Sequence, residues 1–590
     1  MNFFKNVLAT VVGIFIFLFI SFFMLMIVGV FLSASGSNNT VKTKSNSVID
    51  LDLTMVTDDY GGKTYIEDFQ FSDQKSDGLV DVMNAIEYAK TDDRIKGIKI
   101  FNPRISLGLT QSKELREKLE EFKKTGKFVV AYADAYSQGT YYLSSIADTL
   151  YVNPVGDFDF RGLASQVAYF KDFQDKTGIE MQVIRHGKYK SAVEPFLQQN
   201  MSEANREQIT DMLNSIWNTI ATDISDARNI SLDSLNSIAN NLGARTPQLA
   251  LQKKFVDKVA YVDEFENGIK KALGVKKDEK YNEIKVLDYV TEVKPKFNNS
   301  SVKDAIAVIY AQGEIRGGEG NAKIIGEGSI NRALVKARND DNIKAVVLRV
   351  NSPGGSALTS DLILREVDLT RKVKPVIVSM GDVAASGGYY IASRADHIFA
   401  EPTTITGSIG VFGMIPNLEK LANKWGINVE EVKTHQRSGG YSLLKELSPE
   451  AKAEIQESIE RVYDTFVTHV SEGRNMTKEQ VDEIGQGRVW TGVKAKEIGL
   501  VDELGGLDDA IEYAAGKVEL SKYKVLSFPE YKISFSDLIA DLLGVKMKAN
   551  HKAMMIEQIG KENYEMLERI NYLEQAKGVQ AIMPYQLNIN

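Results

Sequence analysis

The sequence contains no cysteine, which excludes disulfide bonds, thiolate metal ligands and a cysteine nucleophile. Histidine is scarce, and the five histidines are scattered without the spacing of metal ligands, so a zinc enzyme is not expected. A basic excess is also missing, because the formal net charge is −8 and there is no basic stripe. We therefore expect no metal and no nucleic-acid partner, and no motif in the chain indicates a cofactor.

Charge is absent between Lys5 and Lys42, where the run Val7–Leu32 consists mostly of Ile, Leu, Phe, Val and Met. A run of this length can cross a hydrocarbon core of about 30 Å, whereas the apolar core of a cleaved signal peptide has about 7 to 15 residues. We expect an uncleaved N-terminal membrane anchor and flank over residues 1–41. The small residues Ser33–Gly36 keep a cleavage site open as the alternative.

The two halves of the chain repeat each other. Asp92–Ile98 (DDRIKGI) matches Asp340–Val346 (DDNIKAV) at a shift of 248 positions, and the same shift sets Asp134–Pro154 against Asp382–Pro402 without a gap. With 590 residues the chain is too long for one hydrophobic core. A period this long indicates domain duplication, because the units of a solenoid have about 20 to 50 residues.

Strand-like apolar runs alternate with helical patterns in each half, which is typical of a mainly parallel sheet covered by helices. The expected organisation after the anchor is a first repeat (42–275), a linker (276–303), a second repeat (304–520) and a C-terminal extension (521–590). Within the extension, Ser534–Val545 has the pattern of a short amphipathic helix.

An apolar run that breaks into a small-residue turn carries a candidate nucleophile. Pro375–Met380 has the β-branched content of an interior strand, and Ser386 follows it at an expected helix start. Free N–H groups and the helix dipole at such a position favour an oxyanion. The same position suits a serine that only caps the helix. A second strand, Val346–Val350, runs into Asn351–Ser356, whose paired glycines let the backbone approach a ligand at the ends of the strands.

The two repeats differ where chemistry is expected. Opposite Ser386 the first half has Gln138, but it also has Lys188 and Lys190, for which the second half offers no lysine. A lysine in such a loop is usually a solvated surface group. A buried lysine with a lowered pKa, however, can deprotonate a serine. The halves therefore look complementary, one carrying the serine and the other the base.

Four motifs together closely resemble those of the bacterial signal peptide peptidases of the SppA (protease IV) family in its long, duplicated form. They are NSPGGS (351–356), ASGGYY (385–390), TGSIGVFG (406–413) and KYKSAVEPF (188–196). The resemblance covers about residues 1–520. It implies an α/β fold class with two tandem ClpP/crotonase-like domains after an N-terminal transmembrane helix.

The resemblance also implies roles for individual residues. Ser386 matches the nucleophile, Lys190 matches the general base in preference to Lys188, and Ser408 matches the hydroxyl that positions the lysine amine. A neutral lysine could take the serine proton and pass it to the leaving amine.

The expected oxyanion hole consists of backbone N–H groups. The glycines that match it are Gly387 and the Gly354–Gly355 pair, with Gly354 preferred. By the same resemblance, the expected function is a serine endopeptidase with a Ser/Lys dyad that degrades remnant signal peptides. It would be anchored in the bacterial inner membrane by a single pass, with its catalytic domains on the periplasmic side. Homo-oligomers are expected. The serine and the lysine of the dyad could come from one chain or from two neighbouring chains.

Three other functions remain open at this point. A crotonase-type acyl-transfer enzyme could share the fold, but it would need neither Lys190 nor an anchor. A non-catalytic membrane scaffold would have no reason to keep the serine, the lysines and the glycines together. A Ser/His/Asp hydrolase would need His186 or His397, and neither lies in a recognisable triad motif.

Overall fold

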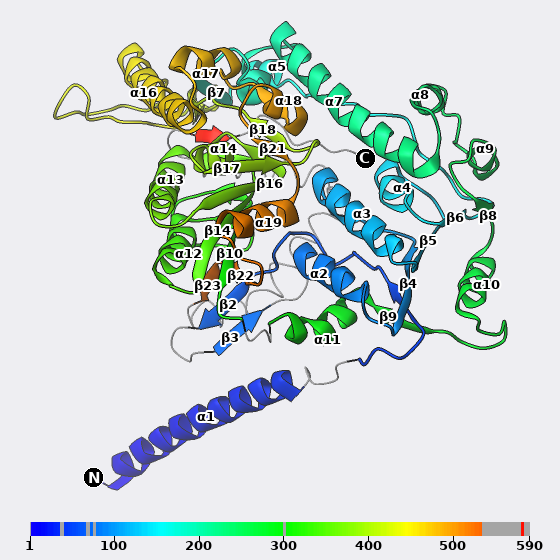
Figure 1. Cartoon of the computed structure of the whole chain (residues 1–590). Coiled ribbons are helices and arrows are strands. Elements are labelled where there is room, and N and C mark those ends of the chain that lie inside the picture. The colour runs from blue at the N-terminus through cyan, green and yellow to red at the C-terminus, as the bar shows by residue number, and fades with distance from the viewer. Residues whose placement is uncertain are drawn as a thin grey trace.

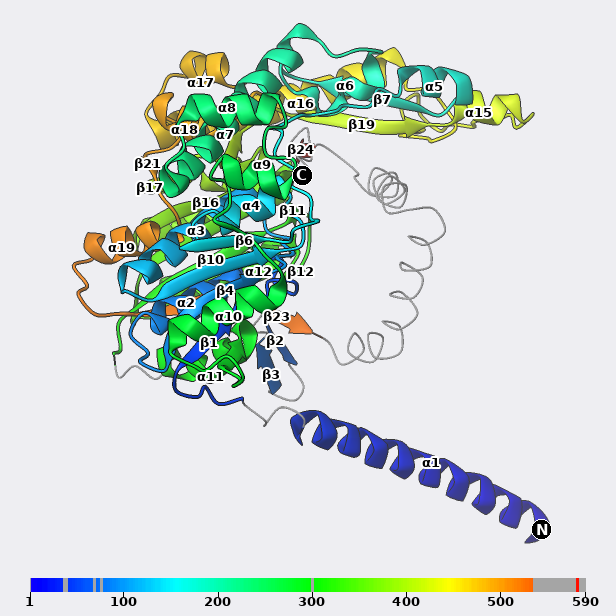
Figure 2. The same cartoon turned by 90° about the vertical axis from the view of Figure 1, so that its right-hand side faces the viewer.

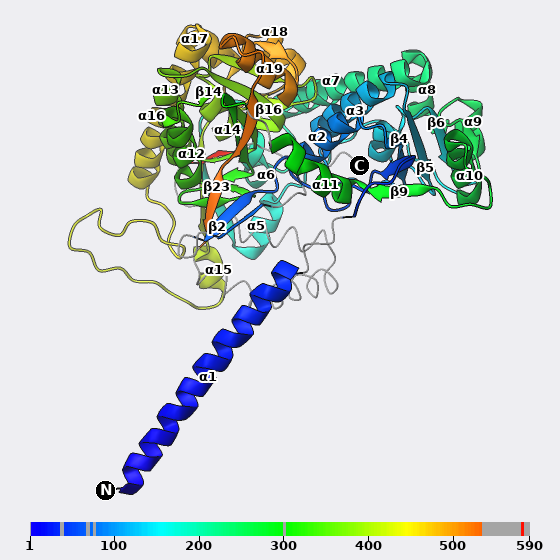
Figure 3. The same ribbon diagram turned by 60° about the horizontal axis from the view of Figure 1, so that its bottom comes forward.

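The computed structural model describes residues 2–35, 41–66, 71–74, 78–298, 302–533 and 580–582. Helix α1 (Asn2–Ser35) projects away from the rest of the chain, which forms two halves side by side (Figure 3). Among the described residues, Lys5–Met24 within α1 is the one stretch that is long and apolar enough to cross a membrane, and none of it is buried against the domains. The predicted apolar run therefore lies within one helix, and its part up to Met24 has an uncovered apolar surface.

The first half forms a parallel sheet of six strands in the order β8-β6-β5-β4-β1-β9 (Figure 1). The strands are β1 (Ser47–Asp50), β4 (Ile95–Phe101), β5 (Phe128–Ala133), β6 (Thr149–Val152), β8 (Lys258–Val259) and β9 (Asn282–Lys285). The helices are α2 (Leu79–Ala89), α3 (Leu109–Lys124), α4 (Gln138–Ser144), α5 (Lys171–Thr177), α6 (Glu194–Leu197), α7 (Glu203–Arg228), α8 (Leu232–Asn240), α9 (Pro247–Gln252), α10 (Val262–Leu273) and α11 (Val286–Asn298). A 3₁₀ turn, η1 (Ser191–Val193), precedes α6. The β-branched strand residues fill the core, and Ile49, Ile98 and Val129 are fully buried.

The second half repeats this arrangement. Its main sheet has the order β20-β18-β16-β14-β10-β22, with β17 paired to β16 and β21 paired to β17. The strands are β10 (Ala305–Gln312), β14 (Ile343–Ser352), β16 (Val376–Ala385), β17 (His397–Ala400), β18 (Ile405–Gly407), β20 (Val489–Thr491), β21 (Glu503–Leu504) and β22 (Lys524–Phe528). The helices are α12 (Glu327–Asn339), α13 (Ala357–Arg371), α14 (Gly387–Ala392), α15 (Glu419–Lys424), α16 (Pro449–Arg474), α17 (Lys478–Ile484), α18 (Gly492–Glu497) and α19 (Leu507–Lys517).

Helices α7 and α16 show the duplication in detail. Each has 26 residues, and each begins after a serine, Ser202 or Ser448, whose hydroxyl accepts the N–H group three residues later. Each ends at an asparagine, Asn229 or Asn475, in the left-handed conformation that closes a helix. The matching caps explain why the sequence repeat stays in register over this helix.

Two predicted boundaries need revision. Residues 276–303 were expected to be a linker, but they carry β9, which pairs with β1, and α11, which packs on α2. The start of the C-terminal extension likewise contributes β22, which pairs with β10 at the matching edge of the second sheet. The sequence pattern did not predict β9 or β22, because each strand is short and lies among charged residues. The amphipathic helix expected at Ser534–Val545 lies outside the described residues.

Two smaller sheets connect distant segments. In one, β7 (Glu180–Arg185) of the first half pairs antiparallel with β19 (Phe412–Asn417) of the second, as the adjacent strands in Figure 2 show. The other strands of that sheet are β11 (Glu314–Ile315), β12 (Gly320–Asn321), β13 (Ile324–Ile325), β15 (Gly354–Ser356) and β24 (Gln580–Ile582). The second small sheet consists of β2 (Lys63–Ile66), β3 (Phe71–Gln74) and β23 (Glu530–Ile533). The pairing of β7 with β19 brings the lysine loop, which follows β7, to the second half.

Candidate active site

Ser386 lies on a sharp turn between β16 and α14 and is fully buried. Its backbone has φ 55° and ψ −115°, a conformation that is rare for a residue with a side chain and that costs about 1–3 kcal/mol. Its N–H donates to Gly407 O (2.8 Å), and its carbonyl accepts the N–H of Tyr390 (2.8 Å). These contacts from two neighbouring elements hold the strained turn in place.

Lys190 reaches Ser386 from the other half of the chain. Its Nζ lies 2.8 Å from Ser386 Oγ, 3.0 Å from Ser408 Oγ and 3.2 Å from Ser408 O. The lysine is fully buried, and burial lowers its pKa well below the ordinary value of a lysine. The amine is therefore neutral over a wider pH range than a surface lysine and has a lone pair that can take a proton.

Ser408 holds the amine through a second left-handed turn, with φ 50°. Its N–H donates to Arg488 O (2.6 Å), and its hydroxyl donates to Gly487 O (3.2 Å). A hydroxyl fixed in this way directs its lone pairs toward Lys190 Nζ. The structure thus brings together Ser386, Lys190 and Ser408.

Gly487 is a part of this site that the sequence analysis missed. A Cβ atom at this position would lie 2.6 to 2.7 Å from backbone and Cβ atoms of Lys190, and Gly487 has φ 85°. No side chain fits there while the lysine backbone keeps its place. The glycines at positions 485 and 487 were the available signal, but without a partner in the sequence they look like an ordinary turn.

The expected oxyanion glycines lie beside the serine. Gly387 is the first residue of α14, where helix N–H groups lack an acceptor within the helix. Gly354 and Gly355 form most of β15, which packs against α14, and both have positive φ. In this structure the N–H of Gly354 donates to Ser352 Oγ (3.1 Å).

The remaining candidates lie elsewhere. Lys188 is exposed, with its amine over the ring of Tyr189, so Lys190 is the lysine in contact with the serine. His186 contacts Glu460 (2.6 Å), and His397 faces Glu503 (3.4 Å), so both imidazoles pair with carboxylates away from Ser386. The arrangement gives no support to a histidine triad.

Gln138 occupies the turn that corresponds to Ser386 in the first half. Its side chain is buried, accepts from Gly162 N (2.9 Å) and donates to Gly162 O (3.2 Å). The first half thus uses this turn for structure.

Strand β24 lies directly beside the site. It pairs antiparallel with β15, where Gly354 faces Ile582 and Gly355 faces Ala581. It also pairs antiparallel with β19 through Gln580 and Phe412. Backbone from the C-terminal segment therefore fills the position between the glycine strand and β19.

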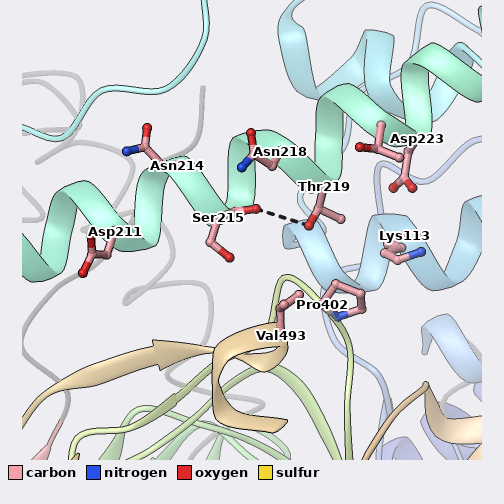
Figure 4. A pocket seen from close by; sticks show the side chains of 10 residues that line it. Lys113, Asp211, Asn214, Ser215, Asn218, Thr219, Asp223, Pro402 and Val493 are labelled. Carbon is pink, nitrogen blue, oxygen red and sulfur yellow. Dashed lines mark hydrogen bonds between the residues drawn. The ribbon is translucent and has the colours of Figure 1, made fainter. Parts of the chain in front are cut away.

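A cavity of about 600 Å³ lies apart from the dyad. Figure 4 shows Asn214, Ser215 and Asn218 of α7 on one side of it, with Pro402 and Val493 of the second half below. Lys113 of α3 reaches its edge. Neither Ser386 nor Lys190 is among its lining residues, so the chemistry proposed below does not use it.

Comparison with known proteins agrees with this arrangement. Residues 121–276 and 368–521 both match Peptidase family S49. Protease 4 of Haemophilus influenzae is 39% identical over 443 residues, covering 74% of this chain and 72% of that protein. Protease 4 of Salmonella typhi is 38% identical over 500 residues, covering 82% and 78%. The chloroplastic serine protease SPPA of Arabidopsis thaliana is 34% identical and covers 78% and 68%.

These matches define the protein as a serine peptidase. The chain belongs to Peptidase family S49, whose domain it contains twice. The family resemblance seen in the four motifs is thereby confirmed, as is the expected organisation into two tandem α/β domains. Among solved structures, a point mutant of ClpP1 from Listeria monocytogenes matches 37% of this chain and 99% of that chain, at 17% identity and a TM-score of 0.25.

Proposed function

We propose that this chain is a membrane-anchored endopeptidase that cleaves peptides with a dyad of Ser386 and Lys190. The observation that carries the proposal is the 2.8 Å contact between Lys190 Nζ and Ser386 Oγ in a fully buried position. Burial lowers the pKa of the amine and so favours its neutral form, and a neutral amine in contact with a hydroxyl is the arrangement that general-base catalysis requires.

The reaction proceeds in two stages, acylation of the serine and hydrolysis of the acyl ester. Lys190 takes the proton of Ser386 as Oγ attacks the carbonyl carbon of the peptide, and the tetrahedral intermediate carries its negative charge on the carbonyl oxygen. Lys190 then gives the proton to the leaving amine as the C–N bond breaks, which leaves an acyl ester on Ser386. Water, deprotonated by Lys190, attacks the carbonyl carbon of this ester. The bond from that carbon to Oγ then breaks, the acyl part leaves as a carboxylic acid, and Lys190 returns the proton to Ser386 Oγ. Ser408 orients the amine through both steps.

The oxyanion is stabilised by backbone N–H groups of Gly387 and of the Gly354–Gly355 pair. Gly354 remains the first choice within that pair, although its N–H now donates to Ser352 Oγ. Substrate binding would exchange the Ser352 hydroxyl for the developing oxyanion, which is the stronger acceptor because it is charged.

The expected substrates are extended, apolar peptides such as remnant signal peptides. The pairing of β24 with β15 supports an extended substrate, because β15, the strand that contains Gly354 and Gly355, already pairs with an antiparallel backbone. Helix α1 would hold the two domains beside the membrane in which such peptides remain. The lysine near its N-terminus favours a cytoplasmic start, which puts the domains on the periplasmic side of the inner membrane.

The direct test is peptide cleavage by the full-length chain in detergent, compared among the wild type, Ser386→Ala and Lys190→Ala. Both variants should lose turnover, and Ser386→Ala should also lose labelling by a fluorophosphonate. Lys188→Ala is the matched control, because that lysine is exposed, and it should keep wild-type activity. Full cleavage by Lys190→Ala would refute the dyad, and full cleavage by Ser386→Ala would refute the serine nucleophile and indicate another catalytic mechanism. Absence of cleavage by the wild type would favour the non-catalytic scaffold.

The dyad is proposed to form within each chain, and the protein to assemble as a homo-oligomer. Support for the first point is that both residues of the contact belong to one polypeptide. Co-expression of Ser386→Ala with Lys190→Ala separates the possibilities. Verified mixed oligomers should be inactive if each site belongs to one chain, whereas recovered activity would mean that sites form between chains.

A further inference from the structure

The backbone around Lys190 is held by a buried glutamine that the proposed mechanism does not use. Lysine has a long, flexible side chain, and Lys190 lies between β7 and the single turn η1. Its catalytic contact with Ser386 therefore depends on what fixes the main chain on either side. Gln208, on the long helix α7, is 1% exposed and lies next to this segment.

The amide of Gln208 bonds to both neighbours of Lys190. Its Nε2 donates to Tyr189 O (3.1 Å) and to Ser191 Oγ (2.8 Å). Its Oε1 accepts the N–H of Val489 (3.3 Å), the first residue of β20 in the second half. One side chain of the first half thus spans the lysine segment and a strand of the second half.

The strand that Gln208 bonds leads directly to the nucleophile. Val489 pairs with Gly407 where β20 meets β18. The carbonyl of Gly407 accepts the N–H of Ser386 (2.8 Å). The amide of Gln208 therefore connects the backbone around Lys190 to the backbone around Ser386. The connection runs through the pairing of β20 with β18, across the junction of the two halves.

Further buried polar groups hold Gln208 itself. Its Nε2 also lies 3.2 Å from Asn205 Oδ1, and Asn205 Nδ2 donates to Glu194 (3.3 Å). Glu194 in turn accepts the N–H (2.9 Å) and the hydroxyl (2.7 Å) of Ser202 at the start of α7. A satisfied buried network of this kind fixes side-chain orientation, since each member loses a bond if it rotates.

The second repeat offers an internal comparison. The shift of 246 that sets Ser202 against Ser448 sets Gln208 against Glu454. Glu454 is exposed and forms a surface ion pair with Arg437. The duplicated helix therefore does not need a buried amide at this position. The buried amide is present in the half that carries the lysine.

We propose that Gln208 is a positioning residue for Lys190: it holds the lysine segment against the second half so that the amine meets Ser386. This inference rests on the proposed dyad. Gln208 does not touch the reacting atoms, so its loss should lower the rate of the chemical step and leave peptide binding nearly unchanged.

The test is Gln208→Met in the full-length enzyme, which keeps the length of the side chain and removes its hydrogen bonds. We expect kcat to fall at least about tenfold while KM changes less than about twofold. We also expect the acid limb of the pH profile of kcat/KM to move to higher pH, because a loosened lysine gains access to water and its pKa rises toward the usual value. Glu454→Met, the matched change in the other repeat, should leave all three quantities at wild-type values.

A second variant keeps the inference testable if Gln208→Met folds poorly. Ser191→Ala removes one acceptor of the same amide, and it should lower kcat in the same direction by a smaller factor. A purely structural role would lower the melting temperature and the amount of active enzyme, with an unchanged pH profile, and that outcome would overturn the inference. Failure of the dyad would be seen separately, as retained activity in Lys190→Ala.

Discussion

Lys190 lies in a fully buried position, and burial is the cause of its lowered pKa. Surroundings that favour the neutral form of a lysine leave more of its amine unprotonated at physiological pH, but they cost stability, because the unfolded chain can protonate the amine and the folded chain resists this. The burial that suits the residue to the proposed role of a base therefore also makes the folded protein less stable. This loss of stability can be measured.

Lys190→Met should therefore stabilise the protein while abolishing cleavage. Between the lowered folded pKa and the unfolded pKa near 10.4, the unfolded state binds more protons, so the lysine destabilises the fold there. We therefore expect the variant to have a higher free energy of unfolding than the wild type at pH 7. Denaturation of wild type and variant between pH 7 and pH 10 should show the gain shrinking as pH rises. A gain independent of pH would contradict the explanation.

Among the elements, β15 and β24 lie beside the proposed catalytic serine. Parallel sheets present their ligand sites at the carboxyl ends of the strands, and Ser386 and the glycine pair lie at the ends of β16 and β14. Strand β24 pairs with β15 at that position. Any peptide that pairs with β15 in the same way must first replace it.

Removal of residues 534–590 should thus raise kcat/KM for an added peptide severalfold, because the edge of β15 becomes available. Ala581→Pro should act in the same direction, since proline lacks the N–H that a strand needs on its paired side. Ala581→Ser keeps that N–H and serves as the control with wild-type kinetics. Unchanged kcat/KM in both the truncated protein and Ala581→Pro would show that β24 does not compete with substrate.

At the scale of the whole molecule, a buried ionic cluster joins the two halves. Arg349 of β14 donates to Asp59 (2.8 Å) and to both oxygens of Glu114 on α3 (2.8 Å each), and it is 1% exposed. Asp382, four residues before Ser386, accepts the N–H of Thr110 at the start of α3 (2.8 Å). Burial raises the pKa of Asp382 to about 6 and that of Glu114 to about 7. The negative charges of these buried carboxylates depend on the positive charge of Arg349 to offset the cost of their burial.

Arg349→Met should accordingly lower the free energy of unfolding by about 3–5 kcal/mol, because it leaves carboxylates buried without their counter-ion. Chemical denaturation of the detergent-solubilised chain measures this. Arg371→Met removes an ion pair with Asp396 that is about one-third exposed, and it should cost less than about 1 kcal/mol. Equal losses in the two variants would refute a special role for the buried cluster.

The amino-acid pattern predicted the features that depend on short-range order. The apolar run became α1, the alternation of strand and helix patterns became two mainly parallel sheets, and the repeat became matching helices with matching caps. The predictions of fold and repeat succeeded where the physical cause lies within a few residues along the chain. The four motifs also pointed to Ser386, Lys190 and Ser408, whose side chains are in contact in the structure.

Tertiary structure decided everything that depends on segments far apart in the sequence. The distance from Lys190 to Ser386, the burial that lowers the pKa of the amine, and the glycine at position 487 that the lysine backbone requires all arise where the two halves meet. Strands β9, β22 and β24 were missed because their partners, not their own residues, make them strands. Sequence by itself indicated which residues are candidates for the chemistry and which fold carries them. Only the packing of one repeat against the other determined that they meet, because desolvation and contact geometry are properties of the assembled chain.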